Sequence, residues 1–279
     1  MMVTKRRLVL ALALSAFFSY PSLAGTLFIG TDMEDFGGGC PGCPAGTIDR
    51  IGKTTVTGAT VNVSTIIYLN QFLNGLGDGA GFLYAGQAVT SHINEIDYNG
   101  NFLGAGFNAA IPAACCNEEL QLVGNVLYHA HYNNEIEQLD PVTGAAVAPP
   151  LAQADVVGMA NVAGQVWISK WSGRTVGTWN PLTNVYTPVF STPTNAGGIA
   201  FDADSNILWV GLQGGLVVPY TLAGVPLNGG FLPFGAINDT IDGLTFLGEG
   251  RRAAVPEPAT LLMLGSGLVG AMRLRKRKI

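Results

Sequence analysis

The chain has 279 residues, of which 48% are hydrophobic, 12% are charged and 38 are glycine, a composition that excludes a disordered protein and also a helical bundle, whose interior loses about 1 kcal/mol per glycine. Between Gly25 and Val255 the chain carries 18 Asp or Glu against 6 Lys or Arg, a net charge of −12 that the whole-chain value of −5 conceals, so no basic stripe is available to bind nucleic acid. These limits leave a glycine-punctuated all-β protein of one large domain or two small ones.

Residues 1–24 have the organisation of a secretory signal peptide. Basic residues at 5–7 precede an apolar run over 8–18, and Ser22-Leu23-Ala24 is typical of a cleavage site. An uncleaved anchor helix is the alternative, but the apolar run is short and Pro21 interrupts it. We therefore expect an exported chain from which this segment is removed.

A repeat of about 40 residues runs through residues 25–250, the predicted folded domain. Its first anchor is an aromatic residue, then an apolar residue or histidine, then a small residue. It occurs as Phe28-Ile29-Gly30, Tyr84-Ala85-Gly86, Tyr128-His129-Ala130, Trp167-Ile168-Ser169 and Trp209-Val210-Gly211. Several short strands at this period are typical of β-propeller blades, so five copies predict a five-bladed β-propeller.

A second anchor follows each first anchor and leads to a turn residue. These anchors are Ile48-Asp49, Ile96-Asp97, Leu139-Asp140, Trp179-Asn180 and Tyr220-Thr221, and the turn residues are Gly52, Gly100, Gly144, Asn184 and Gly224. The two anchors lie 11 or 12 residues apart in the last four copies, the length of two strands joined by a hairpin. They lie 20 apart in the first copy, which predicts an insertion of about eight residues there. The less regular region Thr54–Gly81 leaves a sixth, degenerate blade as the alternative.

The two ends of the repeat region predict that the ring closes on itself. The segment 242–246 resembles 197–201, which precedes the Trp209 anchor by one strand. The first copy has no strand before its own anchor, so we expect Leu244–Leu247 to supply the innermost strand of the first blade. Such closure leaves no open sheet edge between the first and last blades.

Four cysteines lie in two close pairs, Cys40 with Cys43 and Cys115 with Cys116. In an exported chain this number favours disulfides, with three pairings open. A four-cysteine zinc site is the alternative, although adjacent cysteines chelate a tetrahedral metal poorly.

Two histidines and one acidic cluster are candidates for a metal site. His129 and His131 share one face of a strand, but the sequence fixes no third ligand beside them, so we expect a polar pair that lines a channel or a blade surface. Asp32, Glu34 and Asp35 form the densest acidic cluster and are the weak candidates for calcium, with a solvated loop as the alternative. We expect no other cofactor.

The sequence contains no nucleophile elbow, P-loop, HExxH or dinucleotide motif. Glycosidase propellers place two carboxylates near the central channel, and Glu95, Asp97, Glu135 and Asp155 are the acidic residues from which such a pair would be drawn. No sequence feature marks two of them as a pair. The segment 202–206 begins like a calcium loop but lacks its sixth-position glycine, so it predicts a hairpin turn. We therefore expect no catalytic residues.

Residues 251–279 predict a separate sorting segment. Pro256-Glu257-Pro258 is followed by the apolar run 259–272 and then by five basic residues within 273–278. A 14-residue helix spans about 21 Å, short of the roughly 30 Å hydrocarbon core, and snorkelling basic side chains and local thinning of the bilayer make up the difference. The basic end stays cytoplasmic, which tethers the exported body to the inner membrane.

The order of Pro256-Glu257-Pro258, a short apolar helix and basic residues beginning with Arg273 and Arg275 resembles the PEP-CTERM sorting signal of Gram-negative bacteria. In that family an exosortase, a membrane protease-like enzyme, recognises the signal and removes the tail, and the proteins accompany exopolysaccharide and biofilm matrix. The resemblance covers about the last 25 residues. It implies a periplasmic, membrane-tethered precursor that is then released to the cell surface or matrix. A plain tail anchor is the alternative.

Together these features predict an exported, non-enzymatic β-propeller with an interaction or structural role, whose partners include the exosortase-type enzyme and either exopolysaccharide or surface proteins. Two alternatives remain open. One is a carbohydrate-binding or carbohydrate-active propeller that acts on exopolysaccharide, and the other is a calcium-stabilised adhesion module.

Overall fold

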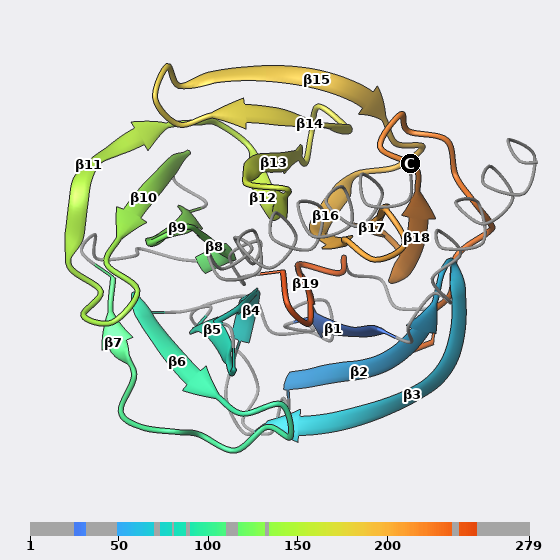
Figure 1. The fold of residues 1–279 in the computed structure, drawn as a ribbon, viewed down its shortest axis with the longest axis horizontal. Coiled ribbons are helices and arrows are strands. Elements are labelled where there is room, and N and C mark those ends of the chain that lie inside the picture. Colours follow the sequence, from blue (N-terminus) through green and yellow to red (C-terminus); the bar gives the residue numbers. More distant parts are fainter. Residues whose placement is uncertain are drawn as a thin grey trace, which may run out of the picture.

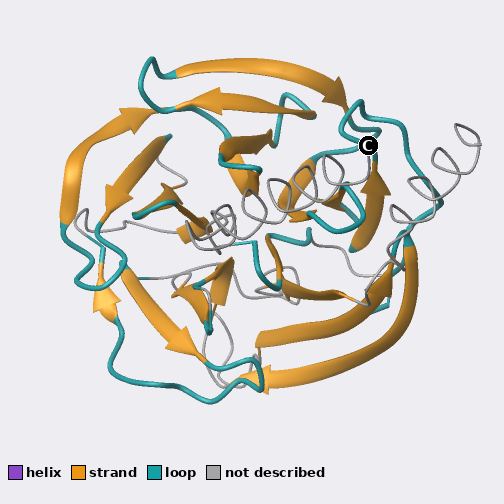
Figure 2. Cartoon of the chain, viewed as in Figure 1, coloured by secondary structure: helices purple, strands orange, loops and turns teal. Residues whose placement is uncertain are grey.

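The computed structural model describes residues 25–31, 49–69, 73–79, 81–87, 90–109, 117–131, 134–235 and 240–249. The predicted signal peptide, the sorting tail with its helix at 259–272, all four cysteines and the acidic cluster at 32–35 lie outside the described residues. Within the described ranges the chain forms strands and no helix (Figure 2). Consequently no described helix is long and apolar enough to cross a membrane.

The strands form five antiparallel sheets that surround one axis as the blades of a propeller (Figure 1). From the axis outward, blade 1 contains β19 (Gly243–Phe246), β1 (Gly25–Thr31), β2 (Asp49–Thr57) and β3 (Thr60–Leu69), and blade 2 contains β4 (Leu73–Asp78), β5 (Leu83–Gln87), β6 (His92–Ile96) and β7 (Phe107–Asn108). Blade 3 contains β8 (Asn117–Val123), β9 (Val126–His131), β10 (Glu135–Leu139) and β11 (Ala146–Ala152). Blade 4 contains β12 (Val156–Val162), β13 (Gln165–Lys170), β14 (Thr175–Asn180) and β15 (Val185–Ser191), and blade 5 contains β16 (Ala196–Asp202), β17 (Ile207–Leu212) and β18 (Leu216–Tyr220). The prediction of five blades is confirmed, and the region that suggested a sixth supplies strands to blades 1 and 2.

The ring closes through the last strand of the propeller. β19 pairs antiparallel with β1, so that Leu244 lies opposite Ile29 and Phe246 lies opposite Leu27. The same strand packs against β16 of blade 5 and β4 of blade 2. The predicted closing strand is therefore confirmed, beginning one residue earlier than expected.

The aromatic residue of each first anchor builds the interface with the next blade. Five hydrophobic clusters lie between neighbouring blades, and each contains one anchor aromatic residue: Phe28, Tyr84, Tyr128, Trp167 and Trp209. Trp209 of blade 5, for example, is fully buried with Leu244 and Phe246 of blade 1. The 40-residue repeat therefore reflects the need of every blade to bury one large ring against its neighbour.

The turns follow the prediction in four blades and depart from it in the first. Gly100, Gly144, Asn184 and Gly224 all have positive φ, between 54° and 88°, as a tight turn requires. Gly52, in contrast, lies inside β2 opposite Ile29, and the turn glycine of blade 1 is Gly58, with φ of 56°. The predicted anchor Ile48-Asp49 was wrong because a local Ile-Asp-Gly pattern resembles the anchor, whereas cross-strand pairing decides which residues end the strand.

The outer edges of the blades are protected against further strand pairing. β11 carries Pro149 and Pro150, and β15 carries Pro188, none of which can donate a backbone hydrogen bond. Blade 5 has three strands, and Val217 of its outermost strand exchanges two backbone hydrogen bonds with Phe231 from the following segment. That segment covers the edge where the other blades have a fourth strand.

Candidate functional site

The five inner strands have equivalent residues at the propeller axis. Pairing with the second strand of each blade identifies the set Leu244, Leu76, Leu120, Met159 and Ile199, in blades 1 to 5. The preceding residue is glycine in four blades, as Gly243, Gly75, Gly158 and Gly198. In blade 3 it is Glu119. The repeat is thus broken at one position of the axis.

Glycine at this position lets neighbouring inner strands pack backbone against backbone. A Cβ atom on Gly158 would lie 2.4 Å from the carbonyl oxygen of Gly197, and one on Gly243 would lie 2.6 Å from that of Asn74. Real Cβ atoms do not approach so closely. The blades therefore converge too tightly for side chains at these points, and a single longer side chain fills the axis instead.

The Glu119 side chain is that occupant, with no exposed surface. Its Oε1 accepts hydrogen bonds from the backbone N–H of Leu76, at 3.0 Å, and from that of Leu120, at 3.4 Å, and its Oε2 accepts one from Leu244 at 3.2 Å. One carboxyl group therefore joins the inner strands of blades 1, 2 and 3. Burial raises its pKa well above the ordinary value, and the three N–H groups oppose that rise.

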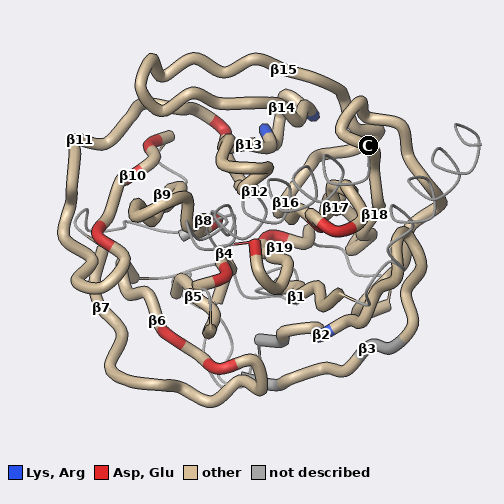
Figure 3. Tube along the Cα trace, viewed as in Figure 1, with Lys and Arg blue, Asp and Glu red and all other residues tan. Residues whose placement is uncertain are grey.

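A second buried carboxyl group joins other inner strands. Glu249, just after β19, accepts hydrogen bonds from the backbone N–H of Asn161 at 2.8 Å and of Phe246 at 3.0 Å. Burial raises the pKa of Glu249 as well, with a smaller contribution from the negative charge of Asp78. Figure 3 shows acidic positions gathered near the axis around β4 and β19. Two buried carboxyl groups therefore connect the inner strands around the axis.

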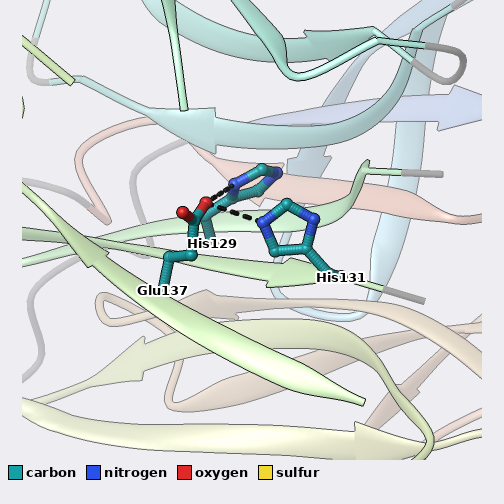
Figure 4. A group of neighbouring side chains, drawn as sticks. All are labelled: His129, His131 and Glu137. Carbon is teal, nitrogen blue, oxygen red and sulfur yellow. Dashed lines mark hydrogen bonds and ion pairs between the residues drawn. The ribbon is translucent and has the colours of Figure 1, made fainter. Parts of the chain in front are cut away.

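Blade 3 contains a second departure from the repeat, a buried cluster of His129, His131 and Glu137 (Figure 4). The Oε2 atom of Glu137 lies 3.0 Å from Nδ1 of His129 and 2.6 Å from Nε2 of His131. The three side chains are at most 2% exposed, and the two imidazole centroids are 4.1 Å apart. The expectation of a polar pair on a channel or blade surface was wrong, because the pair is buried inside the fold.

Burial and pairing set the charge states of this cluster. Burial lowers the pKa of His129 to about 4, against the opposing effect of its hydrogen bond with Glu137. Burial acts to raise the pKa of Glu137, but the hydrogen bonds with the two imidazoles lower it to about 2. At neutral pH Glu137 is therefore ionised beside a neutral His129. A carboxylate with two imidazoles is a donor set that proteins use for transition metals.

Sequence reasoning missed Glu137 and Glu119, although each left a signal. In the pairing of β9 with β10, His129 lies opposite Glu137 and His131 lies opposite Glu135. Both pairs are symmetric about position 133 in the sequence. The Asn133-Asn134 pair is a turn signal at that centre. Glu119 would have emerged from an alignment of the five inner strands, because it replaces their shared glycine.

The acidic residues considered as a catalytic pair have separate structural roles where their contacts are described. Asp97 accepts hydrogen bonds from the backbone N–H of Asn99 and Asn101, and Asp155 accepts them from Ser172 and Gly173. Each therefore organises a loop of its own. The segment 202–206 forms the predicted hairpin turn, in which the side chain of Asp202 accepts hydrogen bonds from the backbone N–H groups of Asp204 and Ser205.

Comparison with protein families identifies the tail. Residues 254–278 match the PEP-CTERM protein-sorting motif. This motif marks an exported protein that an exosortase-type enzyme processes. The predicted Pro-Glu-Pro signal at 256–258 and the basic cluster that includes Arg273 and Arg275 lie within the matched residues. A search of curated proteins finds no match to the chain.

Several solved structures are similar to this chain at low sequence identity. A chain in a crystal structure of a nidogen/laminin complex is 12% identical, with a TM-score of 0.50 over 81% of this chain and 98% of that chain. A glutaminyl cyclase from Myxococcus xanthus is 13% identical, with a TM-score of 0.44 over 58% of this chain and 79% of that one. A computationally designed protein, Ika8, is 16% identical, with a TM-score of 0.39 over 67% of this chain and 60% of its own. At these identities the comparison concerns the fold alone.

Proposed function

We propose that the mature protein acts without catalysis, as a propeller displayed at the cell surface or in the extracellular matrix, where it contacts exopolysaccharide or surface proteins. The sorting motif supports the destination, since it couples export to processing by an exosortase-type enzyme. Processing then frees the propeller from the inner membrane. In the body that it releases, no helix among the described residues is long and apolar enough to cross a membrane.

The burial and hydrogen bonding of the two axial carboxyl groups is the observation that supports the non-catalytic part of the proposal. Propeller glycosidases place two carboxylates where substrate reaches them, about 5 to 9 Å apart. Here Glu119 and Glu249 are buried, and their oxygens accept backbone hydrogen bonds from the inner strands. Carboxyl groups that are buried and hydrogen-bonded to the backbone in this way connect the inner strands, and their burial keeps them from a substrate in solvent. The interaction surface is then the outside of the propeller.

The negative charge of residues 25–255 limits which classes of partner the propeller is suited to bind. With a net charge of −12 between Gly25 and Val255, the surface repels polyanions at low and moderate ionic strength. Exposed apolar side chains at two turns, Val142 at 79% and Leu182 at 94% exposure, offer contact points that do not depend on charge. A neutral polysaccharide or a protein surface therefore suits the propeller better than an acidic polysaccharide.

The proposal is tested on protein collected from the surface of cells that produce the chain with its tail. Purified protein is mixed with the exopolysaccharide of the same cells, and both co-sedimentation and the release of new reducing ends are measured. We expect binding to the polysaccharide or to cell-surface protein without new reducing ends. New reducing ends would replace the proposal with the carbohydrate-active alternative, and the absence of binding to both matrix and cells would overturn the interaction role.

The destination is tested by a tail variant with a matched control. Pro256→Ala, Glu257→Ala and Pro258→Ala together alter the sorting tripeptide, and Asp204→Ala alters one acidic residue of a body turn. We expect the tail variant to remain in the membrane fraction with its C-terminal peptide intact, and the control to be processed normally, as measured by mass spectrometry. Normal processing of the tail variant would contradict the sorting role of the tripeptide.

A further inference from the structure

We propose that His129, His131 and Glu137 bind one divalent transition-metal ion of the zinc class inside blade 3. This inference is independent of the surface role proposed above. The three residues each offer one ligand atom, and these atoms lie within 4.8 Å of one another. Two neighbouring strands of one hairpin supply them, β9 both histidines and β10 the glutamate, so backbone pairing fixes their relative positions.

The distances fit a metal with small adjustments of the side chains. Ligand atoms 2.0 to 2.2 Å from a tetrahedral zinc ion lie roughly 3.3 Å from one another. Nδ1 of His129 and Nε2 of His131 lie 3.0 and 2.6 Å from Oε2 of Glu137. The two nitrogen–oxygen distances must lengthen by about 0.3 and 0.7 Å for the ion to fit, while the two nitrogens already lie within 4.8 Å of each other. The ion takes the place of the shared protons, and each neutral imidazole then carries its proton on the ring nitrogen that does not bind the ion.

The donor set selects the class of metal. Two imidazole nitrogens and one carboxylate oxygen suit zinc and its neighbours in the first transition row, whereas calcium and magnesium prefer oxygen ligands throughout. A divalent ion also balances the buried charge of Glu137. The site thus differs in place and in chemistry from the calcium cluster considered at Asp32.

The other blades lack this set of donor side chains at the equivalent positions. The residues equivalent to His129 are Ile29, Ala85, Ile168 and Val210, and the residues equivalent to Glu137 are Gly52, Asn94, Gly177 and Val218. No blade other than the third has a histidine or a carboxylate there. The cluster is therefore an addition to the scaffold that packing does not explain.

The cluster also leaves polar atoms that the fold does not satisfy. Nε2 of His129 and Nδ1 of His131 are buried without a hydrogen-bond partner in the part of the chain that the structure describes. Buried polar atoms are normally paired, because burying them unpaired is unfavourable. These two nitrogens do not contact Glu137, so they are not the proposed ligand atoms; they are the positions that carry the ring protons when the other nitrogen of each imidazole binds an ion.

The test uses the purified full-length protein in detergent, treated with a chelator and then dialysed against Zn²⁺. We expect about one zinc per chain by elemental analysis, a first shell of nitrogen and oxygen at about 2.0 to 2.2 Å by X-ray absorption, and a raised unfolding temperature that a chelator reverses. A triple variant, His129→Val, His131→Leu and Glu137→Val, introduces the residues of blade 5 at the same positions. It should lose the zinc, while the control His92→Ala, which alters the only other histidine, should retain it.

Several outcomes would overturn the proposal. They are a failure to bind zinc at tens of micromolar, preferential binding of Ca²⁺ measured in parallel, zinc retained by the triple variant, or a shell containing sulfur at about 2.3 Å, which would assign the ion to the cysteines. Should the triple variant fail to fold, Glu137→Gln provides the second test. It preserves the size of the side chain and should weaken zinc binding at least about tenfold, and unchanged binding would count against the site.

Discussion

Glu119 at the axis and Glu137 in blade 3 are two equally buried carboxyl groups with opposite surroundings. Glu119 is 0% exposed and accepts backbone hydrogen bonds from three inner strands. Glu137 is 1% exposed and faces two imidazole rings. Burial raises the pKa of Glu119, whereas the imidazoles outweigh burial and lower the pKa of Glu137 to about 2.

The comparison separates a structural carboxyl group from one that is available for chemistry. The partners of Glu119 are backbone donors that belong to the fold, so its removal leaves those donors unsatisfied. The partners of Glu137 are histidine side chains that no other blade carries at those positions, so we expect the fold to depend on them less. Burial alone therefore does not identify a functional site, and the nature of the partner does.

Deleting residues 242–250 should have the largest effect, because it removes both the closing strand and Glu249. The deletion takes away the buried Leu244 and Phe246 and reopens the ring between blades 1 and 5. Each such core side chain is worth about 2 to 5 kcal/mol, comparable with the whole stability of a domain. We expect loss of the cooperative unfolding transition in thermal denaturation.

A truncation after residue 250 is the matched control for this deletion, since it leaves β19 in place. The truncated body should unfold at the temperature of the intact chain. An equal unfolding temperature for the deletion variant would contradict closure of the ring through β19.

Glu119→Leu should destabilise the protein by about 3 to 6 kcal/mol. The substitution leaves the N–H groups of Leu76, Leu120 and Leu244 buried without an acceptor, each at a cost of about 1 to 3 kcal/mol. Urea denaturation measures the loss. Glu119→Gln is the control, because it keeps one carbonyl acceptor and should lose clearly less. Equal losses for the two variants would mean that packing, and not hydrogen bonding, explains the role of Glu119.

The triple variant His129→Val, His131→Leu and Glu137→Val should behave in the opposite way in metal-free protein. Replacing a buried ionic cluster by apolar residues of suitable size is often neutral or stabilising. We expect its free energy of unfolding to be unchanged or higher by up to about 3 kcal/mol, measured in urea with a chelator present. A loss of several kcal/mol would show that the cluster supports the fold as Glu119 does.

The last prediction concerns the pH dependence of stability. The raised pKa of Glu119 means that above the ordinary value of 4.5 the unfolded chain releases a proton that the native state retains. The native state therefore loses stability as pH rises from 4.5 toward the raised pKa, by at most about 1.4 kcal/mol per unit. Glu119→Gln lacks this loss, so the stability advantage of the unaltered protein should shrink between pH 4.5 and 7. If the stability of the unaltered protein relative to Glu119→Gln instead increased with pH, the pKa of Glu119 would be lowered and not raised.

Local features of the sequence were sufficient to predict the architecture of the propeller. The aromatic anchors lie on second strands and the turn residues follow third strands, because hairpins are formed by neighbouring residues and repeat with the blade. Ring closure was also predictable, since the segment at Leu244 resembles the inner strand of another blade. The PEP-CTERM tail could likewise be recognised from the sequence, because a linear motif consists of residues that are adjacent in the chain.

The two buried sites depended on tertiary structure to different degrees. The register of β9 with β10 decided that Glu137, and not Glu135, faces His129, and a shift of one residue would have turned it to the other face of the sheet. The contacts of Glu119 lie further beyond the sequence, because Leu76 and Leu244 are 43 and 125 residues away. The composition and the repeat period determined that the chain forms a five-bladed β-propeller, and the terminal motifs indicated that it is exported. Closure of the ring, which brings distant inner strands together around one axis, decided the contacts of Glu119, and the register of β9 with β10 decided those of Glu137.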